Sequence, residues 1–285
     1  PQYNTQTLQN IKKDIRAILA YEMYQDLDIK NCCPTILFNL CRFENISCPE
    51  LENYLDNRQM CIQQLVEIGV EQQAAKKVFN IFYNGGKLNV WLSTNNVSKC
   101  PQFLTDYYYE MIEIRGKLLN LEKYNKYRKL GIAQNPSNGD GTAMSFLLSD
   151  NERDIMYTAI EWFHKQGFYV STLIHDGCLV SIGEINLTAL NKHIKTMSNF
   201  DIEFAIKELK CDESEYLDGT ENTIDEEMSS SQKCIMSLKF WASSKGYYRA
   251  NVKGTLNCLK TSDSIPYWAM CVCTVDEEKN PIINE

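Results

Sequence analysis

The sequence lacks the features that mark exported and membrane-spanning proteins. It contains no signal peptide and no apolar stretch of about 18 residues. We therefore expect an intracellular protein, cytoplasmic, nuclear or viral, with no membrane partner. Pro1 is not an initiator residue, which is consistent with a chain that begins within a longer protein.

Paired cysteine motifs are also missing, although the chain holds 12 cysteines. No C-x-x-C pair occurs, and the closest groupings are Cys32-Cys33 and Cys271-Val272-Cys273. Without an export signal, we expect reduced and mostly buried thiols. A zinc site formed by Cys258, Cys271 and Cys273 is a weaker alternative.

Charge divides the 285 residues into three parts. Residues 1–211 are close to neutral, with 22 Lys and Arg against 24 Asp and Glu. Residues 212–227 hold eight acids and no base, and the run Ser229-Ser230-Ser231 follows them. Such a stretch is typical of a solvated linker. We predict a body (1–211), an acidic linker (212–232) and a small C-terminal domain of unknown role (233–285).

Hydrophobic periodicity predicts an α+β body with few strands and many helices. The expected elements are a helix over 8–19, a strand ending at Asp28, helices over 34–41, 50–68 and 71–83, a helix that Asp150 caps and Gly167 ends, two strands within 168–180 that turn at 175–177, a helix over 187–197 and a strand over 200–209.

Two aspartates, Asp28 and Asp176, each sit at the end of an apolar run. Carboxylates from two such strands can clamp a pair of divalent metals about 4 Å apart, as nucleotidyl transfer requires. We therefore predict that both residues hold two Mg²⁺ ions. Asp26 points to the same strand face as Asp28 and is a further candidate acid or a salt-bridge partner.

Four motifs in order resemble those of the family A DNA polymerases, whose superfamily also contains the single-subunit RNA polymerases. They are Asp28 with Asn31, then Ala75-Lys76 with Phe82 and Tyr83-Asn84-Gly85, then Gly141-Thr142-Ala143-Met144, and finally His175-Asp176. The resemblance covers about residues 20–211. It implies a polymerase palm with a small antiparallel sheet, helical fingers and the small C-terminal domain beside them.

The resemblance also implies roles for individual residues. Asp28 and Asp176 would hold the metals and His175 would orient a primer end. Lys76 and Lys77 would meet a nucleoside triphosphate, Tyr83 would back the base pair, and Asn31 and Cys33 would lie at the nucleotide.

A basic stripe between the second and last motifs is a candidate nucleic-acid contact. Its bases are Arg115, Lys117, Lys123, Lys126, Arg128 and Lys129. Tyr124 and Tyr127 are interleaved three residues apart, so we expect them on one helical face. Such a stripe can follow phosphates while its rings contact bases. A solvated helix face is the alternative.

Departures from the family pattern are clear as well. Gln72 stands where the family has arginine, Asn84 splits the Tyr-Gly pair, and Cys33 and Gly177 stand where the DNA polymerases have glutamate. Only 27 residues precede Asp28, whereas the family places its thumb before the first motif. Either the thumb was lost, it lies on a missing segment, or a further replication protein supplies the grip. The predicted function is a two-metal DNA polymerase acting on primer-template DNA and nucleoside triphosphates. The alternatives are a single-subunit RNA polymerase or primase, or a non-catalytic nucleic-acid-binding relative.

Overall fold

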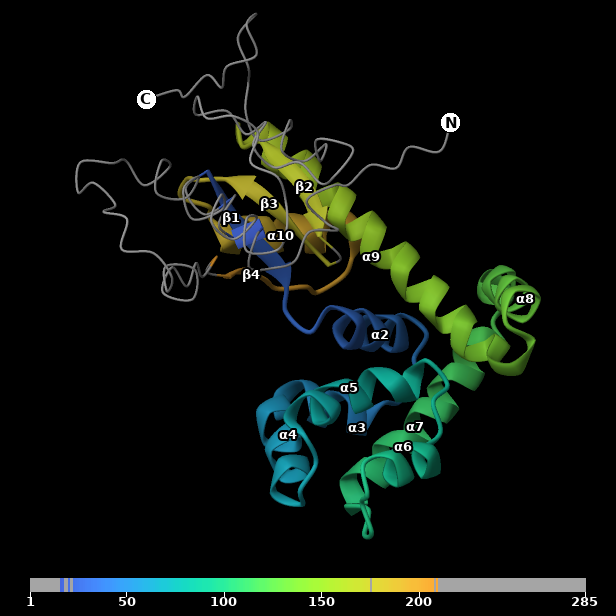
Figure 1. Ribbon diagram of the computed structural model, residues 1–285. Helices are drawn as coiled ribbons and strands as arrows, with labels where there is room; N and C mark the ends of the chain where they lie inside the picture. The colour runs from blue at the N-terminus through green and yellow to red at the C-terminus, as the bar shows by residue number, and fades with distance from the viewer. Residues whose placement is uncertain (1–15, 18–19, 21–22, 175, 208, 210–285) are drawn as a thin grey trace, which may run out of the picture. The chain divides into compact units, whose positions relative to one another are not determined.

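The computed structural model describes residues 16–17, 20, 23–174, 176–207 and 209 (Figure 1). The chain forms two compact units, residues 1–28, 163–185 and 206–285 in the first and residues 29–162 and 186–205 in the second. The fold is α+β, mostly helical with a small antiparallel sheet, as the sequence predicts. The predicted acidic linker and C-terminal domain lie outside the described residues.

Four strands form the sheet, in the order β2-β3-β1-β4. They are β1 (Tyr24–Ile29), β2 (Val170–Ile174), β3 (Gly177–Ser181) and β4 (Phe204–Lys207). β3 pairs antiparallel with both β1 and β2, and Figure 1 shows these three strands side by side. Cys178, Leu179 and Val180 on β3 are fully buried. Successive side chains of a strand point to opposite faces, so both faces of β3 are covered, and such a strand reads as an apolar run.

β1 has one apolar face and one acidic face. Leu27 and Ile29 are buried, whereas Asp26 and Asp28 are half-buried. This alternation follows from the two-residue period of a strand. The side chain of Gln25 fixes the edge of the pair, because its amide donates to the carbonyl oxygens of Ser181 and Gly183 at 3.2 and 2.9 Å.

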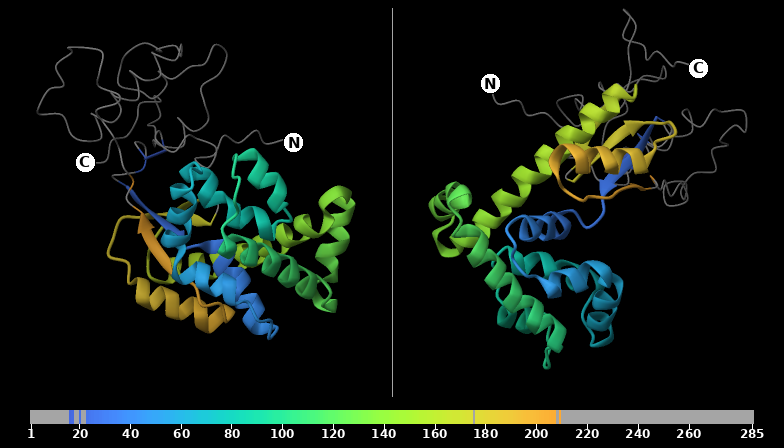
Figure 2. Two further views of the ribbon diagram at one scale, coloured as in Figure 1. Left: turned by 90° about the horizontal axis from the view of Figure 1, so that it is seen from below. Right: turned by 180° about the vertical axis from the view of Figure 1, so that it is seen from behind.

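Helices make up the second unit (Figure 2). They are α2 (Cys32–Phe43), α3 (Pro49–Asp56), α4 (Arg58–Glu67), α5 (Gln72–Tyr83), α6 (Leu88–Thr94), α7 (Gln102–Leu119), α8 (Asn125–Gln134) and α10 (Leu187–Ser198), with the short 3₁₀ turns η2 (Glu122–Tyr124) and η3 (Pro136–Asn138). The long helix α9 (Gly139–Lys165) begins in this unit and ends in the first.

An aromatic cluster holds α3, α5 and α7 together. The rings of Tyr54 and Phe79 stack with their centres 4.0 Å apart. The ring of Tyr107 meets both edge-on, with its centre 5.5 Å from that of Tyr54 and 5.2 Å from that of Phe79. All three residues are at most 2% exposed to solvent. Aromatic pairs of this geometry add about 0.5–1.5 kcal/mol beyond the area that they bury.

A carboxylate from another helix caps α3. Glu110 on α7 accepts hydrogen bonds from the backbone N–H groups of Glu50 and Leu51 at 2.9 and 2.8 Å. The preceding residue, Cys48, makes no side-chain cap, so Glu110 satisfies donors that a helix start leaves open. Burial raises the pKa of Glu110, and these two hydrogen bonds oppose that rise.

Two predicted helices differ in the structure. The helix expected over 50–68 is two helices, α3 and α4, which meet at Asn57; this residue ends one and begins the other with no glycine or proline to signal it. The helix expected to begin at Asp150 begins instead at Gly139. Asp150 lies within it and accepts hydrogen bonds from Tyr127 and Arg153, so its carboxylate serves neighbouring side chains rather than a helix start.

The other described elements agree with the predicted pattern. β1 followed at once by α2, the end of α9 before Gly167 (φ 81°), the two strands after it and helix α10 are confirmed. The last strand is shorter than predicted, Phe204–Lys207. The helix predicted over 8–19 lies mostly outside the described residues. Among the residues that are described, no helix is long and apolar enough to cross a membrane.

The cap on α3 gives a stability prediction. Glu110→Ala removes the acceptor of two backbone donors and should lower the free energy of unfolding by about 0.5–2 kcal/mol, the usual cost of a lost cap. Glu113→Ala, one turn further along α7, removes only an exposed ion pair with Lys117 and should cost at most about 0.5 kcal/mol. Urea unfolding of the two variants measures the difference. Equal losses would show that Glu110 does not act as a cap.

Candidate metal centre

Two carboxylates meet where β1 ends and β3 begins. Asp28 is paired with Gly177 in the register of the two strands, and Asp176 directly precedes Gly177. Both aspartates belong to the first unit and are half-buried. The structure therefore brings together the two residues that the sequence singled out, which lie far apart along the chain.

The glycine after Asp176 allows this approach. A Cβ atom at Gly177 would clash with the carbonyl oxygen of Leu27 and would lie 3.1 Å from Oδ1 of Asp28. Any side chain at this position would push β3 away from β1 at the point where the carboxylates meet. A glutamate at position 177 therefore does not fit here.

The two carboxylates interact directly. Burial raises the pKa of Asp176, and the negative charge of Asp28 raises it further. When Asp176 holds its proton, a hydrogen bond with Asp28 raises the pKa of Asp176 further. Like charges held together in this way bind a cation or share a proton.

Lys207 on β4 supplies a positive charge to the pair. Its ammonium group forms an ion pair with Oδ2 of Asp28 and opposes the rise in the pKa of Asp176. The Lys207 side chain is 55% exposed, against 16% for Asp28. A lysine with this much freedom can swing into solvent when another cation takes its place, so we regard it as a competitor of a bound metal.

The donor set fits Mg²⁺. Both side chains offer carboxylate oxygen, the ligand type that Mg²⁺ prefers, and Mg²⁺ commonly uses one or two carboxylates and takes its other ligands from water and phosphate. Asp26 lies on the same strand, two residues before Asp28, and its charge, after burial, raises the pKa of Cys178 to about 12. Side chains two residues apart share a strand face, so Asp26 adds negative charge to the face that holds Asp28.

The other residues predicted to act here belong to the second unit or are not described. His175 lies outside the described residues. Asn31, Cys33, Lys76, Lys77 and Tyr83 belong to the second unit. Lys76 is half-buried and Lys77 exposed on α5, while Tyr83 is 2% exposed. A ring this buried has no free face for a base, and its role at a nucleotide stays a prediction.

The basic stripe is not one helix, and the two tyrosines predicted to share a helical face lie in η2 (Tyr124) and α8 (Tyr127). It runs from the end of α7 through η2 into α8. Most of its charges have partners inside the unit: Arg115 donates to the carbonyl oxygen of Phe82 at 3.0 Å, Lys117 pairs with Glu113, Lys123 with Glu44, and Arg128 with Asp140.

The two tyrosines of the stripe are also occupied. Tyr124 donates to Glu44 at 3.0 Å and Tyr127 donates to Asp150 at 2.9 Å. The Lys126 ammonium lies 4.5 Å from the ring centre of Tyr127, and Lys129 is exposed. These contacts indicate that the basic and aromatic residues of the stripe hold α7, α8 and α9 together. Nucleic-acid binding by the stripe stays a prediction that concerns mainly Lys126 and Lys129.

Sequence reasoning missed Lys207 and Glu152. Lys207 follows an apolar strand, and no local pattern marks it as the partner of Asp28. Glu152 lies in the middle of α9 and contacts Cys32 at the start of α2. Only the fold brings either residue to its partner.

Comparison with known proteins gives one similarity. No family model matches the sequence. The protein named "Putative helicase V13" of Sputnik virophage is 26% identical over 179 residues, which is 61% of this chain and 23% of that protein. The chain thus spans about a quarter of the length of this relative. The resemblance to the family A polymerases stays a prediction.

This similarity overturns the predicted function. The sequence predicted a DNA polymerase, with an RNA polymerase, a primase or a non-catalytic binder as alternatives, and the relative is named as a helicase. The physical reason for the error is that a pair of metal-binding carboxylates serves many phosphoryl-transfer reactions. Such a pair is a candidate set of metal ligands and leaves the reaction open.

The raised pKa of Asp176 gives a prediction for the metal-free protein. The folded state holds this proton more tightly than the unfolded chain does. The contribution of Asp176 to stability is therefore full below the ordinary aspartate pKa and is lost as pH rises through the raised pKa. Asp176→Asn should raise the melting temperature at pH 7, on the order of 2 °C because solvent screens a half-buried group. The gain should vanish at low pH.

Melting curves from pH 3 to pH 8 in EDTA measure this effect. Glu184→Gln, an exposed acid of the same unit, is the control and should change little at any pH. An Asp176→Asn variant that is less stable than the wild type at pH 7 would contradict the repulsion between the carboxylates.

Proposed function

We propose that this chain is a metal-dependent nucleic-acid-processing part of a helicase-type protein. The observation that carries the proposal is the contact between Asp28 and Asp176 across β1 and β3. The similarity to a protein named as a helicase supports nucleic acid as the partner. A palm-like role of the small sheet belongs to the same proposal: it presents carboxylates to a metal.

The chemistry of the site suits phosphate groups. Mg²⁺ held by Asp28 and Asp176, as two ions or as one, neutralises phosphate oxygens and orients a water or a hydroxyl towards them. The chain's own residues hold the ion, and Gly177 keeps the two strands close enough for both carboxylates to reach it. Lys207 returns to Asp28 when the ion leaves, so the site keeps a balanced charge.

We assign the metal site, rather than the helicase motor, to this chain. Helicases are driven by nucleoside triphosphate hydrolysis, and many such enzymes bind phosphates through a G-x-x-x-x-G-K-[S/T] loop. This pattern does not occur in the 285 residues. The chain matches 23% of its relative, so a motor belongs in our proposal to the longer protein.

Cations of the second unit are candidates for backbone phosphates. Lys76, Lys77, Lys126 and Lys129 form no ion pair among the described residues. Such charges bind nucleic acid without regard to sequence and release counterions, so the affinity falls with salt.

Metal dependence tests the proposal. Asp28→Asn and Asp176→Asn each remove a charged oxygen ligand and should lower Mg²⁺ affinity at least about 100-fold, more than the loss of an outer-shell partner costs. Mg²⁺-dependent binding or cleavage of labelled single-stranded and forked DNA should fall with it. Titration calorimetry and gel-shift assays measure both effects, with Glu184→Gln as control. If both variants retain wild-type Mg²⁺ affinity, the metal site is refuted.

Lys207 provides a test with the opposite sign. Lys207→Met removes the ammonium that competes for Asp28, so Mg²⁺ affinity should rise, by about tenfold or about 1.4 kcal/mol. The Mg²⁺ affinity of Lys195→Met, which breaks an exposed ion pair with Asp201, should stay unchanged. A fall in Mg²⁺ affinity in Lys207→Met would show that the lysine supports the site instead of competing for it.

A further inference from the structure

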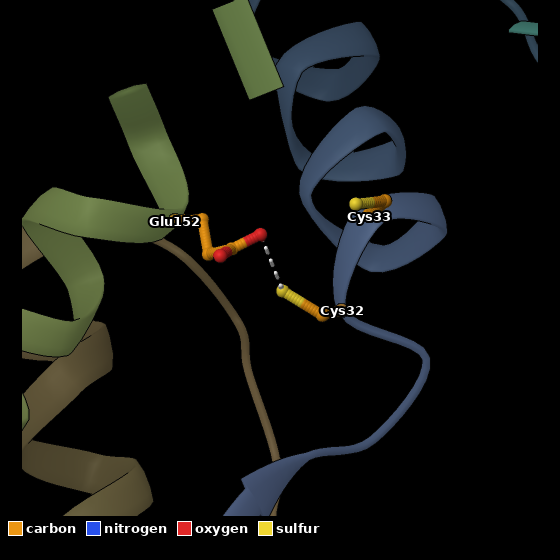
Figure 3. Close-up of side chains that lie close together, drawn as sticks. All are labelled: Cys32, Cys33 and Glu152. Carbon is orange, nitrogen blue, oxygen red and sulfur yellow. Dashed lines mark hydrogen bonds between the residues drawn. The ribbon is translucent and has the colours of Figure 1, made fainter. Parts of the chain in front are cut away.

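Three side chains of the second unit converge on a small volume. The sulfur atoms of Cys32 and Cys33 and a carboxylate oxygen of Glu152 all lie within 4.8 Å of one another. Figure 3 shows both sulfur atoms on the side of α2 that faces Glu152. Among the described residues, this is the group of three or more side chains capable of holding a metal. It involves neither Asp28 nor Asp176.

The start of α2 places the two thiols. Asn31 adopts the left-handed conformation (φ 48°) and turns the chain from β1 into the helix. Cys32 and Cys33 are then the first two residues of α2, whose first turn has no acidic residue and no side-chain cap. The partial positive charge of a helix start stabilises thiolates. Thiolate is the form of cysteine that binds a metal.

Glu152 comes from α9, 120 residues away in sequence. The Cys32 thiol donates to its Oε2 atom at a sulfur–oxygen distance of 3.8 Å. Cys32 is buried, while Cys33 and Glu152 are half-buried. The cluster is therefore shielded on one side and open to entry on the other.

The distances suit a tetrahedral ion. Zinc binds sulfur at about 2.3 Å and carboxylate oxygen at about 2.1 Å, which puts these two ligands roughly 3.6 Å apart in a tetrahedral site. The observed 3.8 Å between Cys32 and Glu152 is close to this value. Two sulfur ligands would lie ~3.8 Å apart, so a small rotation of the half-buried Cys33 completes the set.

We propose that Cys32, Cys33 and Glu152 bind a Zn²⁺ ion. Two thiolates select a soft or borderline ion over Mg²⁺ and Ca²⁺, which prefer oxygen. Three protein ligands leave a fourth position for water or for an external ligand. Each bound thiol releases its proton to solvent, and the proton of the Cys32–Glu152 hydrogen bond is one of these, so zinc affinity rises with pH.

Tyr83 acts as a positioning residue for this site. Tyr83 is 2% exposed to solvent, and its side chain hydrogen-bonds with Cys33. A neutral tyrosine hydroxyl that donates to a ligating sulfur fixes the orientation of that sulfur. In this proposal Tyr83, for which the resemblance implied a role at a base pair, orients the sulfur of Cys33 instead.

Zinc content of the full chain tests the proposal. Wild type, Cys33→Ser, Glu152→Gln and the double variant Cys32→Ser/Cys33→Ser are equilibrated with ZnCl₂, desalted and measured by mass spectrometry. The chain has further cysteines outside the described residues, so the difference between variants is the result. We expect the double variant to lose one equivalent of zinc and the single variants to bind more than about 100-fold more weakly at this site.

Matched controls separate the site from a general loss of thiols or acids. Cys100→Ser removes another half-buried cysteine and Glu161→Gln another acid of α9, and both should retain the full zinc content. Asp28→Asn should retain it too, so failure of the Mg²⁺ site and failure of this one are distinguishable. Unchanged zinc content in the double variant would overturn the proposal.

A second measurement does not depend on variants. Zinc should protect Cys32 and Cys33 of the wild type from alkylation by iodoacetamide, read by peptide mapping, with Cys100 as the reference thiol. Tyr83→Phe should weaken zinc binding about 10–100-fold without changing the stoichiometry. Equal alkylation of Cys32 and Cys33 with and without zinc, or their recovery as a disulfide that binds no zinc, would count against the site.

Discussion

The main electrostatic constraint on the first unit is a pair of like-charged carboxylates that strand pairing holds together. Asp28 and Asp176 repel each other, and the backbone hydrogen bonds between β1 and β3 keep them in contact. Lys207 offsets part of the repulsion. Such an arrangement costs stability in the absence of a cation, and proteins commonly accept this cost where a ligand is to be bound.

In the second unit, side chains connect helices that are distant in sequence. Glu110 caps α3 from α7, Arg115 donates to the last carbonyl groups of α5, and Tyr127 ties α8 to α9 through Asp150. Residues that look like a phosphate-binding stripe in the sequence are therefore largely engaged in holding helices. A charged residue on a helix carries no sign of whether its partner is a phosphate or a neighbouring carboxylate.

Local patterns were predictable and distant partners were not. The strand ending at Asp28, the turn before Gly177 and helix α10 follow from periodicity and turn residues. The break at Asn57 and the early start of α9 have no strong local signal. Lys207 and the cluster of Cys32, Cys33 and Glu152 depend on tertiary contacts across more than 100 residues. The reaction itself was mispredicted because a metal-binding pair is shared by many enzymes.

The long interval between the paired strands affects how the chain acquires its structure during synthesis. Gln25 on β1 bonds to Ser181, 156 residues later. A ribosome therefore releases β1 well before its partner β3 exists, and the edge of this strand stays open while the helices of the second unit are made. Contacts of such long range form slowly, because a large loop must close first. The contact between Asp28 and Asp176 can consequently form only after β3 has been made.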